Sequence, residues 1–167
     1  SLIFDLRYNG GGLLDQAVKT SSLFLEKDRL IVYTQGRDPD SQRKYFSTDD
    51  ALAPDMPLVV LVDEGTASAS EIVSGAIQDW DRGLIVGNTT FGKGLVQQVF
   101  RLPETEDVAL KLTTARYYVP SGRSIQKPSR STKHPKSDLD EENVDLVENP
   151  KSEEDVYYTN KGRKVYG

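Results

Sequence analysis

Apolar and polar residues alternate in blocks along the chain, and these blocks predict a series of strands and helices. Short apolar runs bounded by glycine, proline or polar residues predict buried strands, and the runs are 2–6, 30–34, 58–62 and 84–86. Apolar residues recur at helical spacing in residues 13–25 and again from near Ser68 to Trp80, which predicts two helices. The alternation of strand and helix up to Val86 predicts an α/β layer with parallel strands.

The rest of the sequence predicts further strands and contains one acidic stretch. The strand-like runs are 43–46 (an extended edge piece), 95–102, 108–118, 156–158 and 164–166. Residues 138–155 carry nine acidic residues against one lysine and few large apolar side chains. That composition is typical of a solvated loop or a disordered insert.

Composition narrows the class of protein. The 167 residues suffice for one domain with its own core, and 37% hydrophobic and 28% charged residues are ordinary for a globular chain. The net charge of -5, with no evident basic face, argues against a nucleic-acid partner. No apolar run approaches the roughly 20 residues of a membrane span. The absence of cysteine excludes disulfides and thiol catalysis and leaves the compartment open.

The segment DEGTASASEI (63–72) places three hydroxyls where a strand passes into a helix. Thr66 or Ser68 could cap the helix, and on this stretch alone capping is the favoured interpretation. If the helix starts near Ser68, the helical period places the Ser68 side chain on the core side of the first turn. It places the side chains of Ser70 and Ser74 on the opposite side, toward solvent or another layer. A serine at a helix N-terminus after a glycine turn is also suited to nucleophilic attack, because free N–H groups there stabilise an oxyanion.

A nucleophilic serine needs a base, and the sequence offers two candidates. The only histidine, His134, lies in a polar stretch and is interpreted as a solvated loop residue, so a Ser-His-Asp triad is disfavoured. Lys93 lies between two glycines in TTFGKGLV, where it reads as either a turn residue or the base of a Ser-Lys pair.

Two glycine-containing motifs allow more than one structural or functional interpretation. Residues 87–93 match G-x-x-x-x-G-K, but a phosphate-binding loop requires Ser or Thr next and then a helix, whereas Gly94 and a strand-like run follow. The triplet Gly10–Gly12 predicts a tight turn, or backbone N–H groups directed at a developing negative charge.

Four blocks in order resemble the C-terminal processing (tail-specific) serine peptidases: DLRYNGGGLL, DEGTASASEIVSGAIQD, FGKGLVQQVF and ARYYVPSGRSIQ. The resemblance covers Leu2 to Gln126 and implies an α/β fold with a crotonase/ClpP-like core, parallel strands, flanking helices and additional C-terminal β-strands. It implies a Ser-Lys dyad without metal or cofactor. The residues that it assigns are Ser68 as nucleophile, Lys93 as base, Gln97 as the residue that orients the lysine, and the backbone amides of Ala69 and of Gly11 or Gly12 as oxyanion donors. Gly10 stands where members usually have proline.

The same resemblance implies an organisation for the chain. Residues 1–126 would be a partial peptidase core whose first strands and substrate-binding PDZ domain lie upstream, 127–155 a flexible acidic insert, and 156–167 a truncated return segment. The expected substrate is an unstructured polypeptide tail, laid as an added strand near Thr113–Tyr118, and the expected location is periplasmic or secreted. The competing interpretations are a non-catalytic binding or scaffold fragment and, third, a P-loop-like nucleotide-binding protein.

Overall fold

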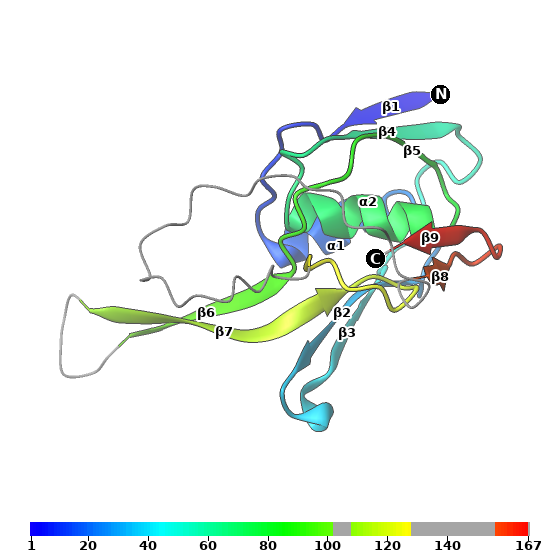
Figure 1. Ribbon diagram of the computed structural model, residues 1–167. Coiled ribbons are helices and arrows are strands. Elements are labelled where there is room, and N and C mark those ends of the chain that lie inside the picture. The colour runs from blue at the N-terminus through cyan, green and yellow to red at the C-terminus, as the bar shows by residue number, and fades with distance from the viewer. Residues whose placement is uncertain (102–107, 128–155, 167) are drawn as a thin grey trace.

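Two sheets enclose a layer of two helices (Figure 1). The computed structural model describes residues 1–101, 108–127 and 156–166. The first sheet is parallel and consists of β1 (Leu2–Asp5), β4 (Leu58–Val62) and β5 (Leu84–Gly87) in the order β1-β4-β5. The helices are α1 (Leu14–Ser22) and α2 (Ala69–Asp79). The predicted strands, helices and parallel pairing are thus confirmed for these elements.

The central strand β4 shows why its sequence forms a strand at this position. Leu58, Val60 and Val62 are buried on the face toward the helices, and the alternate residues Val59 and Leu61 are half-buried. A run of β-branched residues and leucine packs well on a pleated surface that has neighbours on both sides. β4 therefore forms the middle of the sheet and fixes the positions of the loops that follow β1 and β5.

Helix α2 is buried on nearly all sides because it lies between the two sheets (Figure 1). Ile72, Ala76 and Ile77 are no more than 1% exposed, and Ser70 and Ser74 are also buried. Of the two environments predicted for Ser70 and Ser74, solvent or another layer, the second is the observed one. A helix that is covered all round is typical of the centre of a layered domain.

The second sheet is antiparallel. Its strands are, in order, β3 (Arg43–Phe46), β2 (Leu30–Gly36), β7 (Ala109–Tyr118) and β6 (Leu95–Arg101). The prediction that the strand at 30–34 joins the parallel layer is wrong. After β2 the chain turns back through a short 3₁₀ segment at Pro39–Ser41 and pairs with itself, whereas a parallel partner would need a longer crossover.

Strand β7 has no free edge near its end. Tyr118 lies opposite Tyr33 of β2, and Ala115 lies opposite Val96 of β6. The prediction that a substrate strand adds near Thr113–Tyr118 is therefore wrong for most of this segment, because β2 pairs with residues 115–118 and β6 with residues up to 116. Only Thr113 and Thr114 lie beyond the end of the β2 pairing.

The C-terminal residues form the predicted pair of strands, β8 (Val156–Tyr158) and β9 (Lys164–Tyr166). The hairpin is attached to the end of α2, where the Asn160 N–H donates to the Asp79 carbonyl oxygen at 2.7 Å and Arg163 pairs with Asp81 at 3.1 Å. The predicted acidic insert, 127–155, lies outside the described residues except for Lys127. Over the described ranges, none of the helices has the length and apolar character needed to cross a bilayer.

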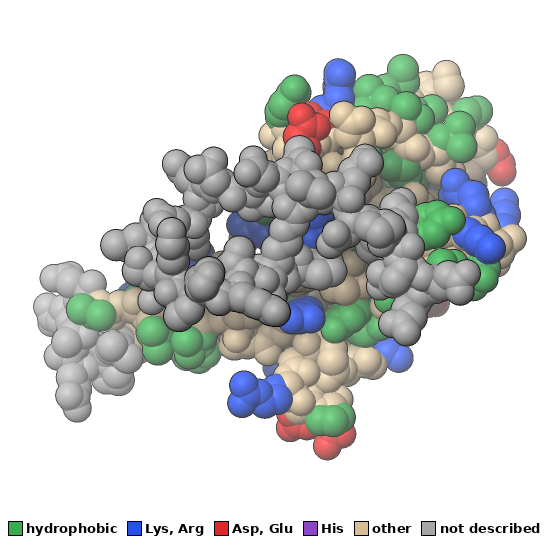
Figure 2. Space-filling model, viewed as in Figure 1, with side chains coloured by type: hydrophobic (Ala, Val, Ile, Leu, Met, Phe, Trp, Pro, Cys, Tyr) green, Lys and Arg blue, Asp and Glu red, His purple; other side chains and the backbone are tan. Residues whose placement is uncertain are grey.

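The outer face of the parallel sheet remains apolar and open among the described residues. Ile3 is 68% exposed and Leu84 62% exposed, and Val86 is exposed beside them. Figure 2 shows hydrophobic side chains gathered at this end of the molecule. Parallel sheets are normally covered on both faces, so this face has the character of a surface that is buried in a larger assembly.

Candidate active site

Three loops that follow the carboxyl ends of adjacent parallel strands come together at one edge of the sheet. They are 6–12 after β1, 63–68 after β4 and 88–94 after β5. In α/β sheets this edge is where ligands bind, because the loops from neighbouring strands meet there. The three loops contain Ser68, Lys93 and the glycine triplet, so the fold gathers nearly all of the predicted site residues.

Ser68 is the N-cap residue of α2 and has a strained backbone. Its φ of 55° and ψ of -116° lie outside the regions that non-glycine residues ordinarily adopt. The helical-phase argument for its side chain therefore does not apply, because Ser68 precedes the first helical residue. The Glu71 N–H donates to the Ser68 carbonyl oxygen at 2.9 Å, and the Glu71 carboxylate accepts from the Ser68 N–H at 2.8 Å. A serine on a sharp strand-to-helix turn has the layout of a nucleophile elbow, although the surrounding motif differs.

The carboxylate of Glu71 joins the loop of Ser68 to the loop of Lys93. Glu71 is buried, and its Oε2 accepts hydrogen bonds from the Ser68 N–H at 2.8 Å and the Lys93 N–H at 2.9 Å. Its Oε1 accepts from the Gly92 N–H and the Thr90 hydroxyl, each at 2.7 Å. Because two nitrogens that bond to one oxygen must be close neighbours, the backbones of Ser68 and Lys93 are held side by side.

The side chains of Lys93 and Gln97 are both exposed. Lys93 lies in the turn before β6, and Gln97 lies opposite Thr113, next to a β-bulge. Within the described residues no hydrogen bond joins the Ser68 hydroxyl to the Lys93 amine. The four-carbon stem of a lysine is flexible, and catalytic hydrogen bonds often form only when substrate is bound. The fold thus holds the backbones of Ser68 and Lys93 side by side through their shared bonds to Glu71.

The glycine triplet packs against the turn that holds Ser68. A β-carbon at Gly11, whose φ is 91°, would lie 2.6 Å from the Ala67 carbonyl oxygen and 2.7 Å from the Ala69 nitrogen, so only glycine fits. The Gly11 N–H donates to the Asn9 side-chain oxygen at 3.0 Å. Among the described residues the Gly12 N–H has no such acceptor. The Gly12 amide thus differs from the Gly11 amide, which already has an acceptor in the Asn9 side chain.

An exposed ion pair lies at the end of β1, next to this triplet. The Arg7 guanidinium bonds to both carboxyl oxygens of Asp5, at 3.0 and 2.8 Å. The side-chain hydrogen bonds from Arg7, together with its N–H, lower the pKa of Asp5 to about 2. The pair therefore stays ionised throughout the neutral range, and its two charges offset each other near the glycine loop.

Residues 1–132 match the family model described as peptidase family S41. The chain belongs to this family. The S41 chain is 48% identical over 124 residues to a carboxy-terminal-processing protease of Bartonella bacilliformis, a match that covers 74% of the chain and 28% of that relative. It is 42% identical over 127 residues to the chloroplastic C-terminal processing peptidase of Tetradesmus obliquus, with 75% and 26% covered. The S41 chain thus spans little more than a quarter of the length of these relatives.

Solved structures of S41 proteases also match the fold of the chain. The photosystem II D1 C-terminal processing protease matches with a TM-score of 0.68 and 40% identity, over 75% of the S41 chain and 31% of that protein. An S41 protease from Bacteroides fragilis matches with a TM-score of 0.61, over 72% and 33% of the two chains. At 21% identity, this second likeness concerns the fold alone.

The structure answers one interpretation from the sequence and adds one residue that the sequence analysis did not single out. The G-x-x-x-x-G-K motif is not a phosphate-binding loop, because strand β6 and not a helix follows Lys93. Glu71, in contrast, was missed. Ser68 and Glu71 have the S-x-x-E spacing of a capping box, which is the one sequence signal that points to this carboxylate.

Replacing Glu71 with glutamine is expected to weaken both the fold and the site. The new amide would direct N–H groups at N–H donors, so buried bonds to a charged acceptor are lost and the free energy of unfolding should fall by about 1.5–3 kcal/mol. The rate at which a fluorophosphonate phosphonylates Ser68 should fall about 10–100-fold, because the two loops are no longer held in register. The exposed Glu64→Gln variant is the matched control. Equal phosphonylation rates in the two variants would contradict the role given to Glu71.

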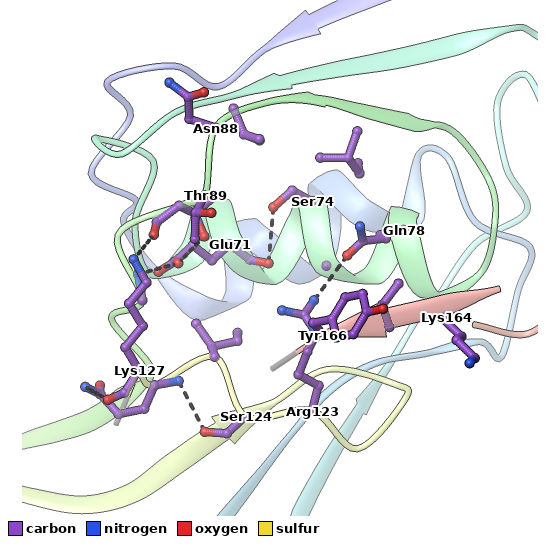
Figure 3. A pocket seen from close by; sticks show the side chains of 18 of the residues that line it. Glu71, Ser74, Gln78, Asn88, Thr89, Arg123, Ser124, Lys127, Lys164 and Tyr166 are labelled. Atoms are coloured by element: carbon purple, nitrogen blue, oxygen red, sulfur yellow. Dashed lines mark hydrogen bonds between the residues drawn. The ribbon is translucent and has the colours of Figure 1, made fainter. Parts of the chain in front are cut away.

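A cavity of about 350 Å³ lies behind the Lys93 loop (Figure 3). Glu71, Ser74 and Gln78 project into it from α2, and Arg123 and Lys127 approach from the opposite wall. Its lining includes neither Ser68 nor Lys93. The cavity is therefore not the place where Ser68 would meet a scissile bond. No cluster of three potential metal ligands occurs within the described ranges.

Proposed function

We propose that the protein is a serine endopeptidase that cleaves polypeptide tails near their C-termini by means of a Ser68–Lys93 dyad. The observation that carries this proposal is the Glu71 carboxylate, which holds the amides of Ser68 and Lys93 on a single oxygen atom. Membership of peptidase family S41, and relatives named as C-terminal processing proteases, support the same activity.

The proposed mechanism assigns one step to each of these groups. Neutral Lys93 takes the proton of the Ser68 hydroxyl while Oγ attacks the scissile carbonyl carbon. The amides of Ala69 and of Gly12, or of Gly11 once Asn9 releases it, would donate to the resulting oxyanion. Lys93 then gives its proton to the leaving amine as the peptide bond breaks. Water, deprotonated by the same lysine, hydrolyses the acyl-enzyme and restores Ser68.

The surrounding residues would support each role. Gln97, placed on β6 just after the Gly92–Gly94 turn, would orient the lysine by a hydrogen bond. An extended substrate would pair with the outer edge of β6, which is the edge of the sheet that begins beside Lys93. The dyad requires neither metal nor cofactor.

Further features belong to the whole protein. The layered core with its parallel sheet is proposed to be of the crotonase/ClpP-like type. A PDZ domain elsewhere in the parent protein would hold the substrate tail, residues 1–126 and 156–167 would be parts of one peptidase core, and the location would be periplasmic or otherwise extracytoplasmic. The matches to longer processing proteases, some of them bacterial and some chloroplastic, support this organisation.

The full-length protein should cut unstructured polypeptides close to their C-termini, as seen by mass spectrometry of the products. A fluorophosphonate should block the cleavage, and a metal chelator should leave it unchanged. Absence of both cleavage and labelling would instead support a non-catalytic scaffold. Thermal stabilisation by a nucleotide would argue against a peptidase.

A further inference from the structure

Two buried side chains tie the glycine loop to the turn that holds Ser68. Thr66 is fully buried, and its hydroxyl bonds to the Leu6 carbonyl oxygen at 2.8 Å. The Asp63 N–H donates to that hydroxyl at 3.0 Å. The Oδ1 of Asp63 in turn accepts from the Tyr8 N–H at 2.9 Å and the Gly65 N–H at 3.0 Å. Each of the two side chains thus bridges the segment after β1 and the segment after β4.

The environment of Asp63 favours its charged form. Burial raises the pKa of Asp63, but hydrogen bonds from the Tyr8 amide, the Thr66 hydroxyl and the Gly65 amide outweigh it, so the pKa lies below its ordinary value. Asp63 makes no ion pair within the described residues. A buried carboxylate whose bonds go to backbone amides is suited to holding loops in place, and it does not touch Ser68.

The loops after β1 and after β4 each contribute different groups to the proposed active site. The segment after β1 brings the Gly12 amide, and the segment after β4 brings Ser68 and the Ala69 amide. Oxyanion donors act only within about 2.7–3.1 Å of the developing charge, so the relative position of the loops decides whether they act together. A third link, from the Ala67 N–H to the Asn9 carbonyl oxygen at 3.0 Å, runs between backbones and cannot be removed by a side-chain substitution.

We propose that Asp63 and Thr66 are positioning residues for the oxyanion hole, and this inference rests on the proposed peptidase function. They set the glycine loop against the nucleophile turn through the bonds to Tyr8 and Leu6. Their loss therefore lowers kcat and leaves KM nearly unchanged, because the reacting geometry is disturbed while the surface that binds the substrate is not.

The test compares variants of the full-length protein with a matched control. Thr66→Val and Asp63→Ala should each lower kcat about 10–100-fold with KM within about threefold. Thr66→Ser and Asp63→Asn keep the bonding oxygen and should retain most of the activity. Ser47→Ala is the control, because Ser47 is a buried hydroxyl that also bonds to backbone, at the Arg29 N–H, away from the catalytic loops. A kcat loss in Thr66→Val no larger than in Ser47→Ala would overturn the inference.

Hydrogen exchange provides a readout that does not require activity. The Tyr8 amide should exchange at least about tenfold faster in Asp63→Ala than in the wild-type protein, and Asp63→Asn should restore its protection. If the wild-type protein neither cleaves peptides nor is labelled at Ser68, the proposed function fails, and exchange then tests only whether Asp63 holds the two loops together. Unchanged protection of Tyr8 in Asp63→Ala would overturn that role whatever the activity is.

Discussion

Replacing Ser68 with alanine is expected to abolish fluorophosphonate labelling and to lower peptide cleavage by at least about 10³-fold. The reason is that no other hydroxyl lies on the strained turn beside Gly11. Thr66 is fully buried and bonded, and Ser70 is buried within α2. The measurement is labelling of the full-length protein, followed by the rate at which it cleaves a tail peptide.

Ser70→Ala is the matched control for this prediction. It removes a hydroxyl from the same segment, but from a helix face that is packed within the domain. We expect the Ser70→Ala protein to retain labelling. Labelling that persists in Ser68→Ala, or that disappears only in Ser70→Ala, would show that Ser68 is not the nucleophile.

Replacing Lys93 with alanine is expected to lower kcat by about 10²–10⁴-fold, which is the usual contribution of a general base. Lys93→Arg should be impaired to a similar extent, because arginine keeps the positive charge but cannot be deprotonated in a protein. The backbone bond from residue 93 to Glu71 is retained in both variants. The loss should therefore appear in catalysis and not in stability, as steady-state kinetics and thermal unfolding would show.

Lys111→Ala is the control for loss of an exposed lysine, since Lys111 is also exposed and lies on β7, which pairs with β6. Its kcat should equal that of the wild-type protein. Substantial activity in Lys93→Arg would mean that residue 93 contributes only a positive charge, and the base would then have to be sought elsewhere.

Local sequence patterns predict the elements of this fold well, but they do not predict which strands pair. The run at 58–62 could be recognised as a central strand because five consecutive apolar residues suit a sheet buried on both faces. The run at 30–34 has a similar composition and yet belongs to the antiparallel sheet. This strand, β2, pairs with β3 because of the turn that follows it, and on its other side it pairs with β7, which lies far away in sequence.

In the candidate site, too, local sequence patterns predict some features and miss others. The order of the four blocks indicated Ser68 and Lys93, and the glycine triplet at a strand end indicated a tight turn or backbone N–H groups directed at a negative charge. Glu71 was missed because its bonds to Gly92 and Lys93 cross 21 and 22 residues of sequence, and no local pattern reports such contacts. Helical phase gives no information on the Ser68 side chain, since a residue with positive φ before a helix does not follow the helix period.

By itself, then, the sequence determined the kinds of elements, the family resemblance and the identity of the candidate nucleophile and base. These depend on residue type and on spacing along the chain. Only the tertiary structure decided that Glu71 holds the two loops together, that Asp63 and Thr66 bind the glycine loop to the nucleophile turn, and that the end of β7 pairs with both β2 and β6. Each of these depends on hydrogen bonds between distant segments, which exist only once the parallel strands have brought their loops to the same edge of the sheet.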